Sequence, residues 1–360
     1  MTSVLFDRLF NNKIIICVGS GGVGKTTVSA SLAVAAAKSG KRVLVMTIDP
    51  SKRLKTALGL APGHETSITR VPNQNYQGEM YALLLDAEAI FREFVTSSST
   101  DPNLADRLLK NRLYRQLSTT LSGSQEFTSL LQLSKIADEK QTDERFDLII
   151  LDTPPAQHAI EFLEAPEKIN ALFQEKIVRW FIGEDMSGGI IQRMIATGTR
   201  TVFSALERIT GSHFMRELND FFASVRSVQT KISEKTQAVE TLLHSKTTAF
   251  ILVTGFDSAK LREAEELNAY LRSSGFHLDT VIINRAFVQN IEMVEPQVEA
   301  LASEYEKWRK YHAGREKVYL EYAEKWRQNL SVIRVPDLNR EVAGLAGLEG
   351  IADELSKNTF

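Results

Sequence analysis

The chain has 360 residues, of which 43 are basic and 45 acidic, and its formal net charge is −2. This near balance gives no electrostatic footprint for nucleic acid or for an anionic membrane, so neither is expected as a partner. The single cysteine excludes a disulfide framework and a cysteine-based metal site and favours a cytoplasmic location, and the lack of about 18 consecutive apolar residues argues against direct membrane insertion.

A glycine-rich loop at residues 19–27 follows an apolar run, residues 14–18, and precedes an alanine-rich stretch, residues 28–38. Its spacing matches GxxxxGK[ST], in which backbone N–H groups and a helix N-terminus cradle phosphate oxygens. The lysine would neutralise the β- and γ-phosphates, and the threonine hydroxyl that follows it would ligate Mg²⁺. We therefore predict a nucleotide site made of Gly21, Gly22, Val23, Gly24, Lys25, Thr26 and Thr27.

Further short apolar runs continue along the chain and alternate with stretches of helical periodicity. Each run is long enough for a strand that is buried on both faces. The alternation predicts an α/β fold with a doubly wound, mainly parallel sheet, whose ligand crevice lies at the carboxyl ends of the strands. The expected strands are residues 42–48, 80–85, 146–151, 249–254, 280–284 and 331–335.

Two regions interrupt this alternation. Residues 160–246 contain no convincing strand, and their apolar and aromatic residues recur at helical spacing, which predicts an inserted helical subdomain. Its aromatic and methionine positions suit either an ordinary core or a groove for an apolar client helix. Residues 295–328 mix charges with aromatic residues and predict long, solvent-facing helices. The P-loop core would then comprise residues 1–88, 136–159 and 247–360, with a mostly helical segment at 89–135.

Two aspartates stand at the ends of expected strands. Phosphoryl transfer to water needs a metal and a group that positions the attacking water. Asp152 suits the first role, holding Mg²⁺ through one of its waters, and Asp49 is the best remaining carboxylate for the second. A strand-end aspartate also commonly caps the following helix, so position alone leaves both assignments open.

Taken together, these segments resemble the arsenical-pump and tail-anchored-protein-targeting ATPases of the MinD-like P-loop class, over most of the chain. The resemblance is carried by several separate motifs. They are residues 19–27; residues 47–51 with Leu58 and Gly59; residues 122–126; residues 152–155 with His158, Phe162, Leu163 and Pro166; residues 281–284; and residues 335–336 with 341–342 and 344–345.

The resemblance implies a Mg²⁺-dependent, cytoplasmic ATPase that cycles between ATP and ADP. It implies that Asp49 positions the water, that Asp152 serves the metal, and that Asn284 with Pro336 and Asp337 encloses adenine. It further implies a homodimer that opens and closes with the nucleotide. Its partner would be a hydrophobic helical client or a membrane protein.

Three departures from the family pattern stand out. Ser20 occupies the position of a family lysine that reaches across the dimer, so Lys52 and Arg53 are the nearest substitutes for its charge. The family's paired zinc-clasp cysteines and its arsenite-binding cysteines are both missing. One P-loop per chain also means that a two-site machine would have to be a homodimer.

The sequence leaves two alternative functions open. A MinD or partition-type spatial-organising ATPase would require a basic amphipathic helix or a basic DNA-binding face, and residues 348–360 are mixed in charge. A small-molecule enzyme of the dethiobiotin-synthetase kind would leave the long aromatic insertion unexplained.

Overall fold

The computed structural model divides the chain into two compact units. Unit 1 comprises Met1–Leu85, Ile136–Ile160 and Leu243–Phe360, and unit 2 comprises Asp86–Lys135 and Glu161–Leu242. No described helix is both long and apolar enough to cross a membrane. The described residues are 4–47, 54, 58–60, 67–72, 74–99, 101–111, 124–138, 146–154, 156–172, 212–287, 299–338, 342 and 344–357.

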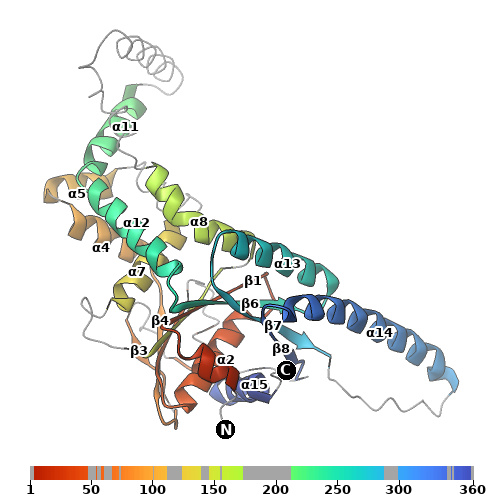
Figure 1. The fold of residues 1–360 in the computed structure, drawn as a ribbon. Coiled ribbons are helices and arrows are strands. Elements are labelled where there is room, and N and C mark those ends of the chain that lie inside the picture. The colour runs from red at the N-terminus through yellow and green to blue at the C-terminus, as the bar shows by residue number, and fades with distance from the viewer. Residues whose placement is uncertain are drawn as a thin grey trace. The chain divides into compact units, whose positions relative to one another are not determined.

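Unit 1 is built on an eight-stranded sheet of order β3-β4-β2-β5-β1-β6-β7-β8. All neighbouring strands are parallel except β3 and β4 (Figure 1). The prediction of a doubly wound, mainly parallel sheet is confirmed. The strands are β1 (Ile14–Gly19), β2 (Arg42–Thr47), β3 (Thr69–Arg70), β4 (Glu79–Leu84), β5 (Leu148–Asp152), β6 (Thr248–Gly255), β7 (Leu278–Ala286) and β8 (Ser331–Pro336).

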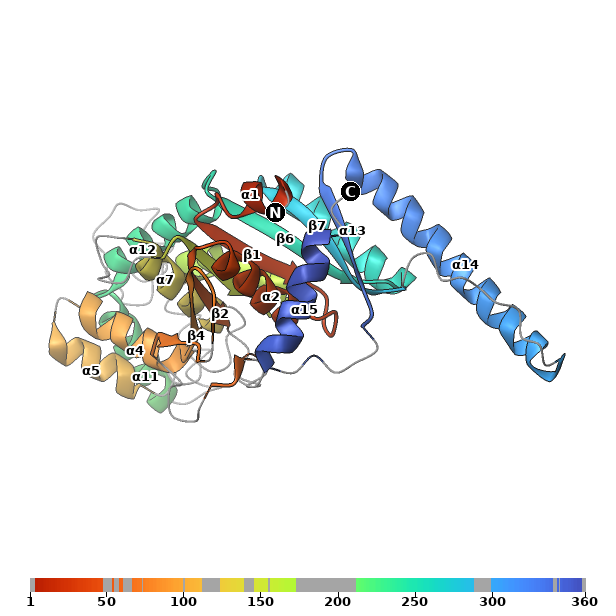
Figure 2. The same cartoon turned by 90° about the horizontal axis from the view of Figure 1, so that it is seen from below.

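Helices cover both faces of this sheet. In Figure 2, α2 and α15 lie against each other over one face, where their buried residues join those of the strands in one core. The alanines of α2 allow a close approach because their side chains are short. On the opposite face α13 packs against β6 and β7. The helices of unit 1 are α1 (Val4–Leu9), α2 (Lys25–Lys38), α13 (Ser258–Ser273), α14 (Glu299–Arg327) and α15 (Gly344–Lys357).

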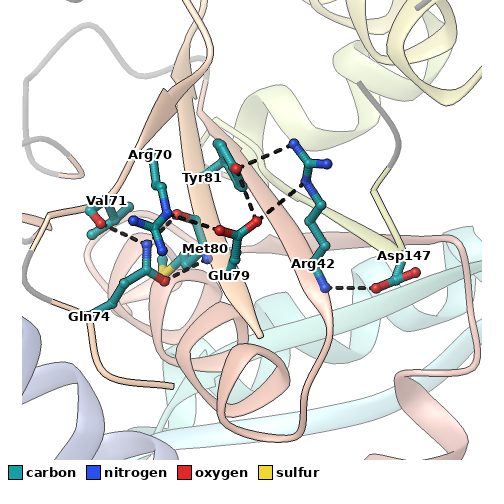
Figure 3. A network of polar contacts seen from close by, with 8 residues as sticks. All are labelled: Arg42, Arg70, Val71, Gln74, Glu79, Met80, Tyr81 and Asp147. Atoms are coloured by element: carbon teal, nitrogen blue, oxygen red, sulfur yellow. Dashed lines mark hydrogen bonds and ion pairs between the residues drawn. The ribbon is translucent and has the colours of Figure 1, made fainter. Parts of the chain in front are cut away.

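The amino ends of β2 and β4 are tied together by polar side chains (Figure 3). Arg42 Nη2 donates to the Tyr81 hydroxyl at 3.3 Å, and the Tyr81 hydroxyl donates to Glu79 Oε2 at 3.1 Å. The Gln74 amide bridges the turn between β3 and β4, donating to the Val71 carbonyl at 2.7 Å and accepting from the Met80 amide at 2.7 Å. This network lies at the end of the sheet opposite the P-loop, so its role is structural.

Residues 295–328 were expected to form long, solvent-facing helices, and most of the described side chains there are exposed or partly exposed. A single helix, α14, occupies residues 299–327, and Tyr319, Ala323 and Trp326 are buried on it. Trp326 Nε1 donates to Glu265 Oε2 of α13 at 2.5 Å. Charged residues stand between these three positions, so the composition of the segment does not show that one side of the helix is buried.

Unit 2 is helical in its described residues. Asp86 and Asp101 cap α4 and α5 by accepting from the amides of Ala89 at 3.0 Å and Asn103 at 2.8 Å. Phe221 and Phe222, which are both buried, pack edge to face at 5.2 Å between ring centroids. The helices are α4 (Ala87–Ser98), α5 (Pro102–Lys110), α11 (Ser212–Val225) and α12 (Gln229–Leu243), with most of α7 (Ser124–Ala137) and α8 (Ala156–Leu172).

A histidine of α14 makes the stability of unit 1 dependent on pH. His312 stacks on Phe287 at 3.5 Å between ring centroids, and burial lowers its pKa against the opposing pull of Glu316, with Arg315 and Arg334 adding to the lowering. The unfolded chain therefore binds this proton at a higher pH than the folded chain, so folding stability falls as pH drops through about 6.5.

We expect His312→Phe to keep the stacking and to lose this pH dependence. Urea unfolding midpoints at about pH 7.5 and about pH 5.5 should therefore differ less in the variant than in the wild type. An equal difference in both proteins would show that other groups account for the acid sensitivity.

Candidate functional site

The P-loop runs from the end of β1 to the start of α2, and two of its glycines are required by their surroundings. Gly19, at φ 154°, lies so close to β6 that a Cβ would overlap the carbonyl oxygen of Val253. Gly24, at φ 91°, is left-handed, and a Cβ there would overlap the Asn284 amide nitrogen. Because these two positions have no side chain, the loop can pass close to β6 and β7. Its backbone N–H groups are then available to a ligand.

Lys25 is 7% exposed and points back into its own loop. Its Nζ donates to the carbonyl oxygens of Gly19 and Ser20, each at 2.9 Å. An ammonium at the N-terminus of α2, where the helix dipole is also positive, is the arrangement that suits a polyphosphate. The sequence predicted that Lys25 would meet phosphates, and the structure shows which contacts it would exchange for them.

Asp152, at the end of β5, joins two strands and the P-loop helix. Its Oδ2 accepts from Thr26 Oγ1 at 2.6 Å and from Thr47 Oγ1 at 3.1 Å, and the residue is 1% exposed. A threonine hydroxyl and a carboxylate are both hard oxygen donors, the ligands that Mg²⁺ prefers. These residues therefore fit Mg²⁺, which would supply charge neutralisation to bound phosphates. Thr47 begins the motif at residues 47–51 that carries part of the family resemblance, but its contact with Asp152 was not foreseen.

The only cysteine, Cys17, lies in β1, two residues before the first glycine of the P-loop. Cys17 is fully buried in β1, and burial together with the nearby Asp152 raises its pKa to about 12, against the opposing charge of Lys25. The thiol therefore stays protonated and acts neither as a nucleophile nor as a metal ligand.

Asn284 approaches the P-loop from β7. Its Nδ2 donates to the Val23 carbonyl at 2.8 Å. The next residue, Arg285, has the left-handed φ of 54°, which is uncommon for a residue with a side chain. The residue after Arg285, Ala286, pairs with Pro336 of β8, and its carbonyl accepts from the Asp337 amide at 2.8 Å. The three residues expected to enclose adenine thus belong to neighbouring strand ends.

The structure therefore brings together most of the side chains singled out by sequence, all of them within unit 1. Lys25 and Thr26 belong to the P-loop, Asp152 contacts it through Thr26, and Asn284 contacts it from β7. Asp49 lies outside the described residues, as do Lys52 and Arg53.

A family model described as an anion-transporting ATPase matches residues 12–357. The chain belongs to the anion-transporting ATPase family. Membership confirms that the protein is an ATPase with a P-loop fold, as the resemblance implied.

Three relatives are similar to this chain over 78–94% of their own length. A protein of Aquifex aeolicus named as an arsenical pump-driving ATPase is 24% identical over 94% of this chain and 78% of its own. The ATPase GET3 of Zygosaccharomyces rouxii is 24% identical over 96% and 90%. The ATPase ASNA1 homolog of Babesia bovis is 24% identical over 98% and 94%.

Proposed function

We propose that the protein hydrolyses Mg²⁺-bound ATP at the P-loop and that this cycle closes and opens a homodimer. The observation that supports the site most is that Lys25 with Thr26, Asp152 and Asn284 meet at one loop from three separate parts of the chain. Lys25 and the loop amides would bind the phosphates, Thr26 and Asp152 would hold Mg²⁺, and Asn284 would face the base. One P-loop in the chain favours a pair of chains.

We propose that Asp49 orients the attacking water. It follows β2, whose last residue, Thr47, already contacts Asp152. Replacement of Asp49 by asparagine should leave ATP and Mg²⁺ binding near the wild-type level but slow hydrolysis by at least about 10²-fold, the scale of lost general-base assistance. Single-turnover hydrolysis measured beside equilibrium binding would separate the two effects. Hydrolysis within threefold of wild type would transfer the role to another carboxylate.

We propose a hydrophobic helical segment, free or part of a membrane protein, as the client of unit 2. Metalloid binding by thiolates is disfavoured, because the only cysteine is buried with its pKa raised to about 12. In the described residues the large exposed apolar side chains are all on α14, at Leu301, Trp308, Tyr311 and Leu320. Among the described residues of unit 2, no large apolar side chain is exposed, so exposure of a client surface by these residues would require a change of state. Trp180, Phe181, Met186 and Met194, which the sequence placed in this insertion, lie outside the described residues.

Hydrogen exchange and light scattering test whether the bound nucleotide changes the exposure of the insertion and the dimerisation of the chain. With a non-hydrolysable ATP analogue, residues 160–246 should exchange faster than with ADP, an apolar dye should bind more, and the mass in solution should double. Identical exchange, dye binding and mass in both states would leave an ATPase without this output. Stimulation of turnover by liposomes or by DNA would instead favour the spatial-organising alternative.

A further inference from the structure

The end of β7 is bulged where it approaches the P-loop. The pairing of β7 with β8 shifts register between Ile283 and Ala286. Two residues of β7, Asn284 and Arg285, therefore stand opposite a single residue of β8, and Arg285 takes the left-handed φ of 54°. A bulge re-aims the side chains of its strand. Here the buried Asn284 donates to the Val23 carbonyl of the P-loop at 2.8 Å, so its direction depends on the bulge.

A buried arginine of β8 holds the chain immediately beyond this bulge. Arg334 Nε and Nη2 donate to the Phe287 carbonyl oxygen at 3.2 and 2.6 Å, and the arginine side chain is 4% exposed. Its neighbours in the strand, Ile333 and Val335, belong to the core that β8 shares with α2 and α15. Because side chains alternate along a strand, Arg334 faces the other side of the sheet, where α14 packs.

The guanidinium of Arg334 is itself fixed in place by α14 and by two rings. Nη1 and Nη2 donate to Glu316 Oε1 and Oε2 at 2.6 and 3.0 Å, which is a bidentate ion pair. The same guanidinium lies over the rings of Tyr319 and Phe256, at 4.7 and 5.0 Å from their centroids. Only a planar group with several N–H donors can bind the carboxylate and the carbonyl at once, so a lysine cannot replace it.

We infer that Arg334 is a positioning residue that holds the bulge of β7 and thereby aims Asn284 at the base of the bound nucleotide. The inference rests on the proposed function, in which Asn284 faces the base. A left-handed residue with a side chain is unfavourable by itself, so the conformation of Arg285 has to be maintained by contacts around it. The phosphates depend on Lys25 and the loop amides. Arg334 therefore contributes to recognition of the base and not of the phosphates.

Competition against a fluorescent ATP analogue on the full chain tests this division, with ATP and inorganic tripolyphosphate as competitors. Arg334→Lys should raise the Kd and the KM for ATP by about tenfold, the scale of a lost hydrogen bond to a charged group, with little change in kcat. Tripolyphosphate should bind within about twofold of wild type, because the phosphate contacts are unchanged. If Arg334→Lys does not fold, Glu316→Gln loosens the same guanidinium and should show the same difference between the two competitors.

Two further variants separate this role from a loss of stability. Asn284→Ala should also weaken ATP binding, and adding Arg334→Lys should weaken it no further, because both changes act through one side chain. Lys325→Ala, which removes an ion pair between α14 and Glu265 of α13, is the matched control and should bind ATP like wild type.

The inference is overturned if Arg334→Lys binds ATP within twofold of wild type. It is also overturned if ATP and tripolyphosphate are weakened equally, or if the effects of Arg334→Lys and Asn284→Ala add. Normal binding of both competitors by Lys25→Ala would instead show that the proposed nucleotide site is wrong.

Discussion

Lys25→Ala is expected to abolish ATP turnover in a protein that remains folded. Turnover should fall by at least about 10²-fold, the scale for one preorganised charged donor, and analogue binding should weaken in parallel. The stability change is the difference of two opposing effects. Losing two charge-assisted bonds to Gly19 and Ser20 costs about 1.5–3 kcal/mol each, while removing an ammonium that is 7% exposed relieves a desolvation penalty of several kcal/mol.

The matched control is Lys38→Ala, at the other end of α2. Lys38 makes an exposed ion pair with Asp353 at 3.2 Å, which is worth at most about 1 kcal/mol, and turnover should not change. ATP hydrolysis and thermal unfolding should be measured on the same preparations. Normal binding and turnover in Lys25→Ala would refute the P-loop assignment, whereas loss of the folded state would show that the two bonds outweigh desolvation.

Asp152→Asn should produce the second large loss, and one that depends on Mg²⁺. The asparagine amide oxygen can still accept from Thr26 and Thr47, so the fold of the site is retained, but the carboxylate charge is gone. We expect turnover to fall by at least about 10²-fold and the Mg²⁺ concentration for half-maximal activity to rise by at least about tenfold. Analogue binding in the presence of a chelator should stay within about threefold of wild type.

Asp147→Asn is the control for this change. Asp147 precedes β5, the strand that Asp152 ends, and its Oδ2 accepts from the Arg42 amide at 2.7 Å far from the P-loop. The asparagine can keep that bond, so Mg²⁺ dependence should be unaltered. An unchanged Mg²⁺ titration in Asp152→Asn would place the metal on other residues.

The sheet was predictable because its strands are buried on both faces and therefore form uninterrupted apolar runs. β3 was not, because two residues carry no periodicity and its antiparallel pairing with β4 depends on the turn held by Gln74. The buried side of α14 was missed for a related reason. Tyr319, Ala323 and Trp326 recur at helical spacing, but only the position of α13 decides that this side is covered.

The candidate site also has a part that could be predicted from the sequence and a part that could not. Gly24, Lys25 and Thr26 could be found because the loop chemistry demands them at fixed spacing. The contact of Asn284 with Val23 arises from the order of β1, β6 and β7 in the sheet. A single sequence does not encode that order in any local pattern, so Asn284 was selected only by resemblance.

The buried thiol of Cys17 also makes the protein well suited to site-specific spectroscopy. Because the only cysteine is buried, its thiol cannot reach a second copy to form a disulfide, and any homodimer must be held by non-covalent contacts. The raised pKa leaves Cys17 unreactive toward maleimide or methanethiosulfonate probes, so wild-type protein already serves as the unlabelled background. One cysteine introduced at an exposed position of each unit would then carry the only labels. The distance between those labels would report directly whether the two units move as ATP is turned over.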